Sequence, residues 1–389
     1  MSVSEINRLN GSSPTPTPVT PEKVRFICRA ALCSKEEAIQ VCEGGRVGDF
    51  DVEKTPQSVR VVSRTILGEG TSTRVVGVKR RLMDGSEESL ARKRPKKEHQ
   101  KEPFKVDLFV NRQLKQTLAS HEYEEASKVL DLVRYEKDDS IESLLRGPDF
   151  EKVNLENMDY PLGFVLSQLS NIAYGLFFLH RAGIMHRDVK PANALSGTEG
   201  LKAALTDFNI SRSIRHKITK TCGTPGYIAP EVHENLRAQI NRVGLEGLNG
   251  DLFGLGRIME HMLTKKLLPL WDQSLTVAQK MCWIKDDEVE EYDASYGKNV
   301  VWVGSKNGEH RVRIYKDPSI RKQLAERAVD SAFANGRIDE AERDALHSYI
   351  DLTYRLIGSQ RPTAIEVYHA LNAMKKGVNI GDSVGSISS

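Results

Sequence analysis

Three short segments in the middle of the chain constrain its fold and chemistry more than any other feature. They are HRDVKPAN at 186–193, DFN at 207–209 and GTPGYIAPE at 223–231. Phosphoryl transfer needs a carboxylate beside the attacking hydroxyl, a cation near the phosphate and oxygen ligands for magnesium. The first two segments offer these groups in Asp188, Lys190, Asn193 and Asp207. The pattern therefore predicts a phosphoryl-transfer site.

Together the three segments resemble the eukaryotic-type serine/threonine protein kinase family, and the resemblance runs over about 61–374. It implies an α+β, two-lobed protein kinase fold with a small β-rich N-lobe and a larger, mostly helical C-lobe. By this resemblance Asp188 looks like the catalytic base and Lys190 like the lysine that contacts the phosphate. Asn193 and Asp207 are the implied metal ligands, and ATP and Mg²⁺ are the implied cofactors.

The resemblance also implies a substrate class. Lys190 and Thr224 are similar to the serine/threonine pattern and unlike the tyrosine-specific one. We therefore expect a transferase, an ATP-dependent kinase acting on Ser or Thr hydroxyls of a protein substrate. The alternative is a kinase-like pseudoenzyme scaffold that binds partners or nucleotide with little catalysis. A third interpretation, a nucleic-acid binder, would use the basic run at 92–97.

A glycine-containing segment that begins at Ile66, ILGEGTSTRVV, fits the nucleotide loop of that family. Gly68 and Gly70 would let the backbone approach phosphates without an intervening side chain. Thr73 replaces the third glycine of the family, so we expect a stiffer loop.

Two lysines compete for the role of phosphate anchor on the next strand. Lys79 follows Val75 too closely for a strand to end, turn and begin again, whereas residues 83–85 supply a turn before Lys93. Strand alternation places Lys93 on the same face as Ala91, which matches the alanine of the family's adenine pocket. The expected nucleotide contacts are Gly68, Gly70, Val75, Ala91, Lys93 and Leu195.

The glutamate that the family pairs with this lysine is not evident in the following helix, predicted over about 105–118. Aligning Leu114 and Leu118 with the usual apolar positions of that helix places Asn111 where glutamate would stand. Asp107, one turn earlier, is the nearest acid on a similar face. The alternatives, if the helix is displaced, are Glu122, Glu124 and Glu125.

Several other positions are interpreted by the resemblance. Asn209 replaces a glycine, and Asn enters left-handed backbone conformations more easily than most residues. Glu231 and Arg361 are expected to form a salt bridge under the activation segment, and Asp251 to hold the catalytic loop. We expect His186 to brace the backbone and not to transfer protons.

The polar segment between Ile210 and Cys222 offers hydroxyls for regulation. A phosphate on Thr219 or Thr221 could pair with Arg187 beside the catalytic carboxylate. An ordinary surface loop is the alternative interpretation.

Composition excludes other classes of protein. With 56 Lys and Arg against 53 Asp and Glu, the net charge of +3 demands no nucleic-acid partner. No apolar run approaches the ~18–20 residues of a membrane-spanning helix, and no secretory signal peptide is evident. The five scattered cysteines are expected to be free thiols. We expect a cytoplasmic protein, or one in the host cell cytosol if the polar start is the signal of a secreted bacterial effector.

The domain organisation follows from these patterns. We expect a disordered polar tail at 1–20, a helical extension at 21–58, an N-lobe at 59–135, a C-lobe at 136–375 and a flexible tail at 376–389. An insertion at 267–349 is a candidate partner surface. It contains a hairpin around Asn307 and Gly308 and, at 335–342, a capped turn that superficially resembles a calcium loop. A strand is predicted over 129–135 and a long helix over 163–182.

Overall fold

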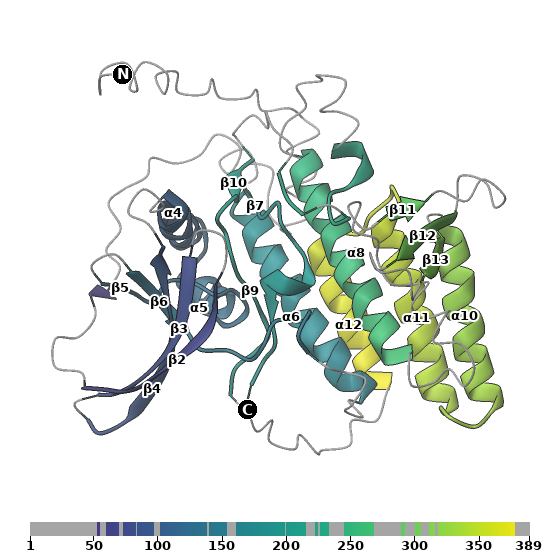
Figure 1. Cartoon of the computed structure of the whole chain (residues 1–389), viewed down its shortest axis with the longest axis horizontal. Helices are drawn as coiled ribbons and strands as arrows, with labels where there is room; N and C mark the ends of the chain where they lie inside the picture. The colour runs from purple at the N-terminus through teal and green to yellow at the C-terminus, as the bar shows by residue number, and fades with distance from the viewer. Residues whose placement is uncertain are drawn as a thin grey trace.

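The computed structural model describes most of the region between residues 53 and 377. The described residues are 53–54, 60–69, 73–82, 84–96, 102–137, 140–153, 161–198, 200–214, 222–224, 226–232, 245–267, 289–291, 300–304, 311–315 and 318–377. They form a small β-rich lobe followed by a larger helical lobe, as expected (Figure 1).

The small lobe is built on a six-stranded sheet of order β1-β5-β6-β4-β3-β2. Its strands are β1 (Glu53–Lys54), β2 (Arg60–Glu69), β3 (Thr73–Arg81), β4 (Glu87–Pro95), β5 (Tyr135–Lys137) and β6 (Ser140–Leu144). All neighbours pair antiparallel except β1 and β5, which pair in parallel. The predicted turn between β3 and β4 is present: Gly85 has a φ of 85° and the Ser86 N–H donates to Asp84 Oδ1 at 2.9 Å.

Two helices accompany this sheet, α4 (Glu102–Thr117) and α5 (Ser120–Val129). α4 agrees with the helix predicted over 105–118. α5 was not predicted, and the strand expected over 129–135 is instead the end of α5 followed by an extended segment that reaches β5 only at Tyr135. Glu122 stabilises the start of α5 by accepting from the Ala119 N–H at 3.0 Å.

The predicted boundary between the lobes is too early. β6 pairs with β4 over four residues and ends at Leu144, so the small lobe extends beyond residue 135. The physical reason is that β6 completes the ladder beside β4, and its polar backbone groups find their partners there.

The large lobe is organised around α6 (Leu162–Arg181), which agrees with the helix predicted over 163–182. α6 packs against α12 (Ala364–Gly377), and α8 (Leu245–Leu267) packs against α11 (Glu340–Ile357) (Figure 1). By length and composition α6 alone among the described helices could cross a membrane, but 78% of that apolar window is buried inside the protein. We therefore interpret α6 as the core helix of this lobe.

Short elements between α6 and α8 carry the predicted motifs. They are β7 (Ile184–Met185), the 3₁₀ helix η2 (Pro191–Asn193), β8 (Ala194–Leu195), β9 (Ala204–Leu205) and β10 (Arg212–Ser213). β7 pairs with β10 and β8 pairs with β9, both antiparallel. The two ladders place the first two motifs of the sequence side by side.

The predicted insertion at 267–349 is too long at its C-terminal end. Within it, β11 (Val289–Glu291), β12 (Val300–Gly304) and β13 (Arg311–Tyr315) form a small sheet, and α10 (Pro318–Ala334) packs on α11. The β12–β13 pair confirms a hairpin, although Asn307 and Gly308 lie outside the described residues. α11 already begins at Glu340 and buries Tyr349 and Ile350 against the core, so 340–349 belongs to the lobe itself.

The turn between α10 and α11 is the capped turn that was predicted. Gly336 has a φ of 66°, and Asp339 caps α11 by accepting from the Glu342 N–H at 2.8 Å. The tail at 1–20 lies outside the described residues. Of the predicted helical extension at 21–58 only β1 is described, and it is a strand; of the tail at 376–389 only the end of α12 is described.

Candidate active site

A buried acid of the large lobe accepts hydrogen bonds from the backbone of the segment predicted as the catalytic loop. Asp251, in α8, is 1% exposed and accepts from the backbone N–H groups of His186 at 2.8 Å and Arg187 at 2.7 Å. His180 Nε2 lies 3.1 Å from the same carboxylate. These bonds stabilise Arg187 at a φ of 72°, which costs a non-glycine residue about 1–2 kcal/mol. His186 Nε2 lies 3.0 Å from the Thr206 carbonyl oxygen, so this ring braces the backbone, as predicted.

The carboxylate of Asp188 has donors on both oxygens. Thr224 Oγ1 donates to Asp188 Oδ1 at 2.8 Å, and Asn193 Nδ2 donates to Asp188 Oδ2 at 2.9 Å. Lys190 Nζ lies 3.0 Å from Oδ2 and donates to Thr224 Oγ1 at 2.6 Å. Residues from the first and third motifs therefore converge on one carboxylate, which fixes its orientation.

Asn193 and Asp207 are brought together by the β8–β9 ladder. The Thr206 N–H donates to the Asn193 carbonyl at 3.0 Å, so Asp207 follows directly after a residue bonded to Asn193. Asp207 itself has a φ of 64°, whereas Asn209 is not among the described residues with positive φ. The interpretation of Asn209 as a left-handed residue is therefore wrong, because the unusual backbone angle falls two residues earlier.

The structure brings Lys93, and not Lys79, to this region. Lys93 Nζ donates to Thr206 Oγ1 at 3.4 Å, next to Asp207. Lys79 is exposed on β3 and forms an ion pair with Glu87 at 2.5 Å. Position on the strand thus separates the two lysines as the spacing predicted.

The acid that faces Lys93 from α4 is Asp107. It is 3% exposed, its carboxylate accepts from the Phe208 N–H, and its charge acts on Lys93. Asn111, predicted as the replacement for glutamate, instead donates through Nδ2 to the Val133 carbonyl at 2.8 Å. Asp107 and Asn111 share a helix face one turn apart, and the placement of α4 sets Asp107 toward the lysine.

The three glutamates considered as alternatives have other partners. Glu122 caps α5 and pairs with Arg181, whereas Glu124 and Glu125 pair with Lys128. They are therefore excluded as partners of Lys93.

The electrostatics of Lys93 are dominated by acids. Burial lowers the pKa of Lys93, but the carboxylates of Asp107, Asp131 and Asp207 outweigh this and raise it to about 12. Burial also raises the pKa of Asp107 to about 6, against the opposing effect of the Lys93 charge. The Lys93 ammonium is consequently charged at neutral pH. The carboxyl of Asp107, with a pKa of about 6, titrates about one pH unit below neutrality.

The remaining predicted nucleotide contacts lie on both lobes. Val75 is directly opposite Lys93 in the β3–β4 ladder and opposite Gly68 in the β2–β3 ladder. Ala91 lies on the same face as Lys93. Leu195, half-buried, lies on β8 in the large lobe. The list of expected contacts also includes Gly70, which is outside the described residues.

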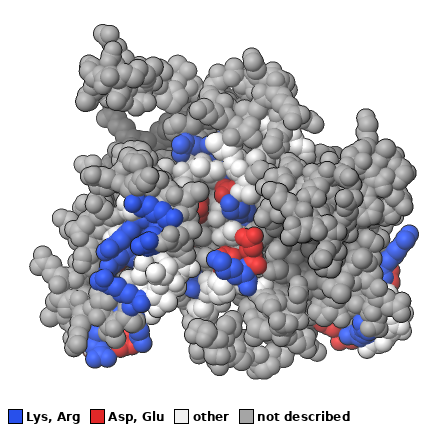
Figure 2. Space-filling view, in the orientation of Figure 1, with Lys and Arg blue, Asp and Glu red and all other residues white. Residues whose placement is uncertain are grey.

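The basic run at 92–97 divides between separate environments. Arg92 is buried and bonded to Glu142, which also bonds the buried Arg80 at 3.0 Å. Arg94 and Lys96 are exposed. Figure 2 shows a band of Lys and Arg side chains over the region of β2, β3 and β4. Because Arg92 and Lys93 have buried acidic partners, the run is not a continuous nucleic-acid patch.

The predicted architectural pair under the activation segment is present. Arg361 binds both carboxylate oxygens of Glu231, with Nη2 donating to Oε2 at 3.2 Å. The regulatory candidates Thr219 and Thr221 lie outside the described residues. Arg187 donates to the Ile210 carbonyl at 3.3 Å.

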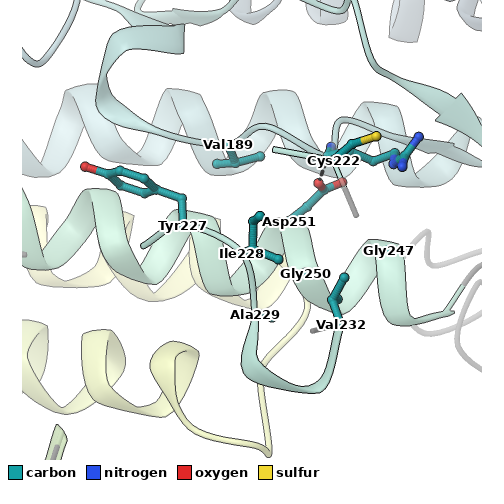
Figure 3. Close-up of a pocket in the computed structure, with 10 residues that line it drawn as sticks. Val189, Cys222, Tyr227, Ile228, Ala229, Val232, Gly247, Gly250 and Asp251 are labelled. Carbon is teal, nitrogen blue, oxygen red and sulfur yellow. Dashed lines mark hydrogen bonds between the residues drawn. The ribbon is translucent and has the colours of Figure 1, made fainter. Parts of the chain in front are cut away.

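A small cavity of about 30 Å³ lies between the catalytic loop and α8 (Figure 3). Val189, Cys222, Tyr227 and Asp251 are among its lining residues. Cys222 is a free thiol, as expected; the other four cysteines are outside the described residues. The volume has room for about one water molecule and none for a nucleotide, so this cavity is not the nucleotide site.

Sequence reasoning missed two residues beside Lys93. Asp131 lies in the segment after α5, and Thr206 immediately precedes Asp207. Thr206 could have been found from its place beside the predicted metal ligand Asp207. Asp131 could not, because the segment around it was predicted as a strand and no local pattern connects it to Lys93.

Comparison with known proteins gives a consistent result. A sequence model described as the protein kinase domain matches residues 61–334. The chain is 27% identical over 186 residues to CBL-interacting protein kinase 10 of Oryza sativa subsp. japonica, which is 46% of this chain and 38% of that protein. It is 33% identical over 150 residues to the serine/threonine-protein kinase PkaB of Streptomyces coelicolor, 33% of this chain and 36% of that protein. It is 35% identical over 120 residues to a probable myosin light chain kinase of Dictyostelium discoideum, 30% of this chain and 36% of that protein. The matched part spans less than two-fifths of the length of each of these relatives.

Proposed function

Because the chain belongs to the protein kinase family, we propose that it is an active, ATP-dependent serine/threonine kinase that phosphorylates a protein substrate. The observation that carries the proposal is the arrangement of Asp188, whose two oxygens are held by Thr224, Lys190 and Asn193. A carboxylate oriented in this way is suited to accept a proton from an attacking hydroxyl.

In the proposed reaction, the substrate hydroxyl oxygen forms a bond to the γ-phosphorus while the bond to the ADP oxygen breaks. The hydroxyl proton passes to Asp188. Lys190, 3.0 Å from that carboxylate, lies where its charge would stabilise the transferred phosphoryl group. Lys93 would bind phosphate oxygens of the nucleotide, because its ammonium remains charged at neutral pH.

The residues present fit a magnesium site. Among the described residues there is no cluster of three or more His, Cys, Asp or Glu side chains that could hold a metal. Magnesium does not require one, since it is commonly held by one or two protein oxygens together with phosphates and water. Asn193 uses Nδ2 for Asp188, which leaves Oδ1 for a cation, and Asp207 offers a carboxylate. The cation would neutralise charge on the phosphates.

The preference for Ser and Thr hydroxyls is supported by Thr224. Its hydroxyl connects Lys190 with Asp188 by donating to the acid and accepting from the lysine. This is the Lys–Thr pattern on which the sequence resemblance to serine/threonine kinases was based. One of the similar proteins described above, PkaB of Streptomyces coelicolor, also carries that activity in its name.

The test is transfer of labelled phosphate from γ-labelled ATP with magnesium, to the chain itself and to generic protein substrates. Asp188→Asn keeps the size of the side chain and removes the base, so we expect incorporation to fall about 10²–10⁴-fold. Equal incorporation by wild type and Asp188→Asn would contradict the proposal and favour the pseudoenzyme scaffold. Mass spectrometry of the labelled chain would also show whether Thr219 or Thr221 is modified.

A further inference from the structure

A buried acid whose charge acts on Lys93 lies outside all of the sequence motifs. Asp131 is 6% exposed and lies between α5 and β5. Its backbone N–H donates to the Leu205 carbonyl at 2.8 Å, which ties this segment to β9, the strand that leads into Asp207. The position of Asp131 is therefore fixed relative to the candidate metal-binding segment.

A threonine hydroxyl connects this acid to the lysine. Thr206 Oγ1 donates to Asp131 Oδ2 at 2.8 Å and accepts from Lys93 Nζ at 3.4 Å. A hydroxyl has one hydrogen, so donation to the acid leaves its lone pairs for the ammonium. The two hydrogen bonds therefore run in one direction: Lys93 donates to Thr206, and Thr206 donates to Asp131.

The same Lys–Thr–Asp arrangement occurs at the catalytic loop. There Lys190 donates to Thr224, and Thr224 donates to Asp188, at 2.6 and 2.8 Å. In both groups the threonine bridges an ammonium and a carboxylate. Lys190 also lies 3.0 Å from its acid, whereas the bond to Thr206 uses one of the three N–H donors of Lys93. The other donors of Lys93 remain for other acceptors, phosphate oxygens included.

Burial of Asp131 needs a compensating charge. A buried, ionised carboxylate is costly unless cations lie close to it. Lys93 is one such cation. The other is Arg146, whose guanidinium is nearly buried and donates to the Lys128 carbonyl at 3.2 Å and the Leu130 carbonyl at 3.5 Å. Asp131 Oδ1 has no hydrogen-bond partner among the described residues, so it interacts with these cations through charge alone.

We propose that Asp131 is a positioning residue of the nucleotide site, which acts through Thr206 to hold the Lys93 ammonium beside the segment that carries Asp207. The inference rests on the proposed function in that Lys93 is taken as the phosphate anchor. It adds a second carboxylate, from a different element, to the acid that α4 provides. Lys93 is consequently held from two sides, by Asp107 and by the Thr206–Asp131 pair.

The experiment compares Thr206→Val, Asp131→Asn and the double variant with wild type, in the full chain. Thr206→Val keeps the shape and removes the hydroxyl; Thr206→Ser restores the hydroxyl. Thr353→Val is the matched control, because Thr353 is also buried and its hydroxyl makes one bond, to the Tyr349 carbonyl at 2.7 Å. Unfolding midpoints show that each variant is folded.

Two measurements are made. Calorimetry with a non-hydrolysable ATP analogue and magnesium gives nucleotide affinity. We expect Thr206→Val and Asp131→Asn each to weaken it about tenfold, the size of one hydrogen bond to a charged group. We expect the double variant to be no weaker than the weaker single variant, because the two residues act as one unit. Thr206→Ser should restore most of the loss, and Thr353→Val should bind like wild type.

The second measurement needs no nucleotide. Competitive acetylation of the amines at pH 9, read by mass spectrometry, reports the fraction of Lys93 that is uncharged. Loss of the Asp131 charge should increase Lys93 labelling roughly threefold or more, with no change in Thr353→Val.

The outcomes separate this inference from the proposed function. Wild-type affinity and wild-type Lys93 labelling in both single variants would overturn the inference, as would losses that simply add in the double variant. A wild-type chain that transfers no phosphate would remove the proposed function only. In that case the changes in Lys93 labelling would still support or overturn the role of Asp131.

Discussion

The two Lys–Thr–Asp groups of this protein differ in how completely their acids are satisfied. At the catalytic loop, both oxygens of Asp188 have donors. Around Lys93, one ammonium faces Asp107, Asp131 and Asp207, and one oxygen each of Asp107 and Asp131 lacks a hydrogen-bond partner among the described residues. The catalytic loop is therefore organised in advance, whereas the lysine site holds an excess of negative charge.

This difference indicates that the two regions have different roles, one in fixed geometry and the other in ligand binding. A fully bonded carboxylate is rigid, and its geometry does not depend on a ligand. A site with unused acceptors and surplus negative charge favours the binding of cations, such as magnesium arriving with a nucleotide. Substitutions in the two regions should therefore have different consequences, mainly for ligand binding and rate around Lys93 and mainly for stability under the catalytic loop.

Among the substitutions that test this comparison, the largest effect is expected for Lys93→Met. Removal of the ammonium leaves the surrounding acids without their cation and, in the proposed reaction, the nucleotide without its anchor, so kcat/KM for ATP should fall about 10²–10³-fold. Lys79→Met is the matched control on the neighbouring strand, because Lys79 is exposed and pairs only with Glu87 among the described residues. Steady-state kinetics of both variants test this prediction, and similar losses in the two would contradict the assignment of Lys93.

The next largest effect concerns the hydrogen bonds that Asp251 accepts from the backbone at the start of the catalytic loop. In the wild-type protein, backbone N–H groups donate to both carboxylate oxygens of Asp251. Asp251→Asn retains only one acceptor oxygen, so we expect the free energy of unfolding to fall by about 3 kcal/mol. Urea unfolding measures it. Asp330→Asn is the control: its exposed carboxylate lies 2.9 Å from His347 Nε2, and such surface pairs contribute about 1 kcal/mol or less. Equal losses in the two variants would show that Asp251 is not the support described here.

The smallest effect is expected for Asp107→Asn, and it depends on pH. The pKa of Asp107 is about 6, above its ordinary value, so the carboxyl is ionised above that pH and protonated below it. At pH 8 the variant should show kcat/KM for ATP about tenfold lower than wild type, since Lys93 loses a charged partner. Below pH 6 wild type loses the same charge, and the two profiles should converge.

The comparison of the two profiles removes the titration of the nucleotide itself, which both proteins share. Because the folded-state pKa of Asp107 is raised, protonation of this group favours the folded state, and its stabilising contribution is lost as the pH rises through about 6. Protonation of Asp107 below pH 6 therefore does not destabilise the folded state, so unfolding caused by this group does not explain a loss of activity in that range. A constant ratio between wild type and Asp107→Asn from pH 5 to 8 would contradict the assignment.

Local patterns predicted which residues the structure brings together around Asp188. Asp188, Lys190 and Asn193 lie within six residues of one another, and Thr224 was recognised from its own motif, so their meeting needs few assumptions. Lys93 followed from strand alternation, which the β3–β4 ladder confirms. The helices at 105–118 and 163–182 were found because long periodic segments are the most reliable signal in a sequence.

Patterns failed where packing decides. The short helix α5 was not predicted, because few apolar positions mark it, and the segment after it was taken for a strand. The end of the insertion was placed at 349, inside α11, because polar residues at the start of that helix do not show that its other face is buried. In each case the burial of one face is a property of the neighbouring element.

The sequence by itself determined the family, the motif that carries Asp188, Lys190 and Asn193, and the strand that carries Lys93. Only the tertiary structure decided which acid faces that lysine, and that Asp131 and Thr206 stand behind it. The physical reason is geometric. Asp107 and Asn111 share a helix face, so which of them meets Lys93 depends on where α4 lies along the sheet, and that is set by contacts between elements far apart in the chain.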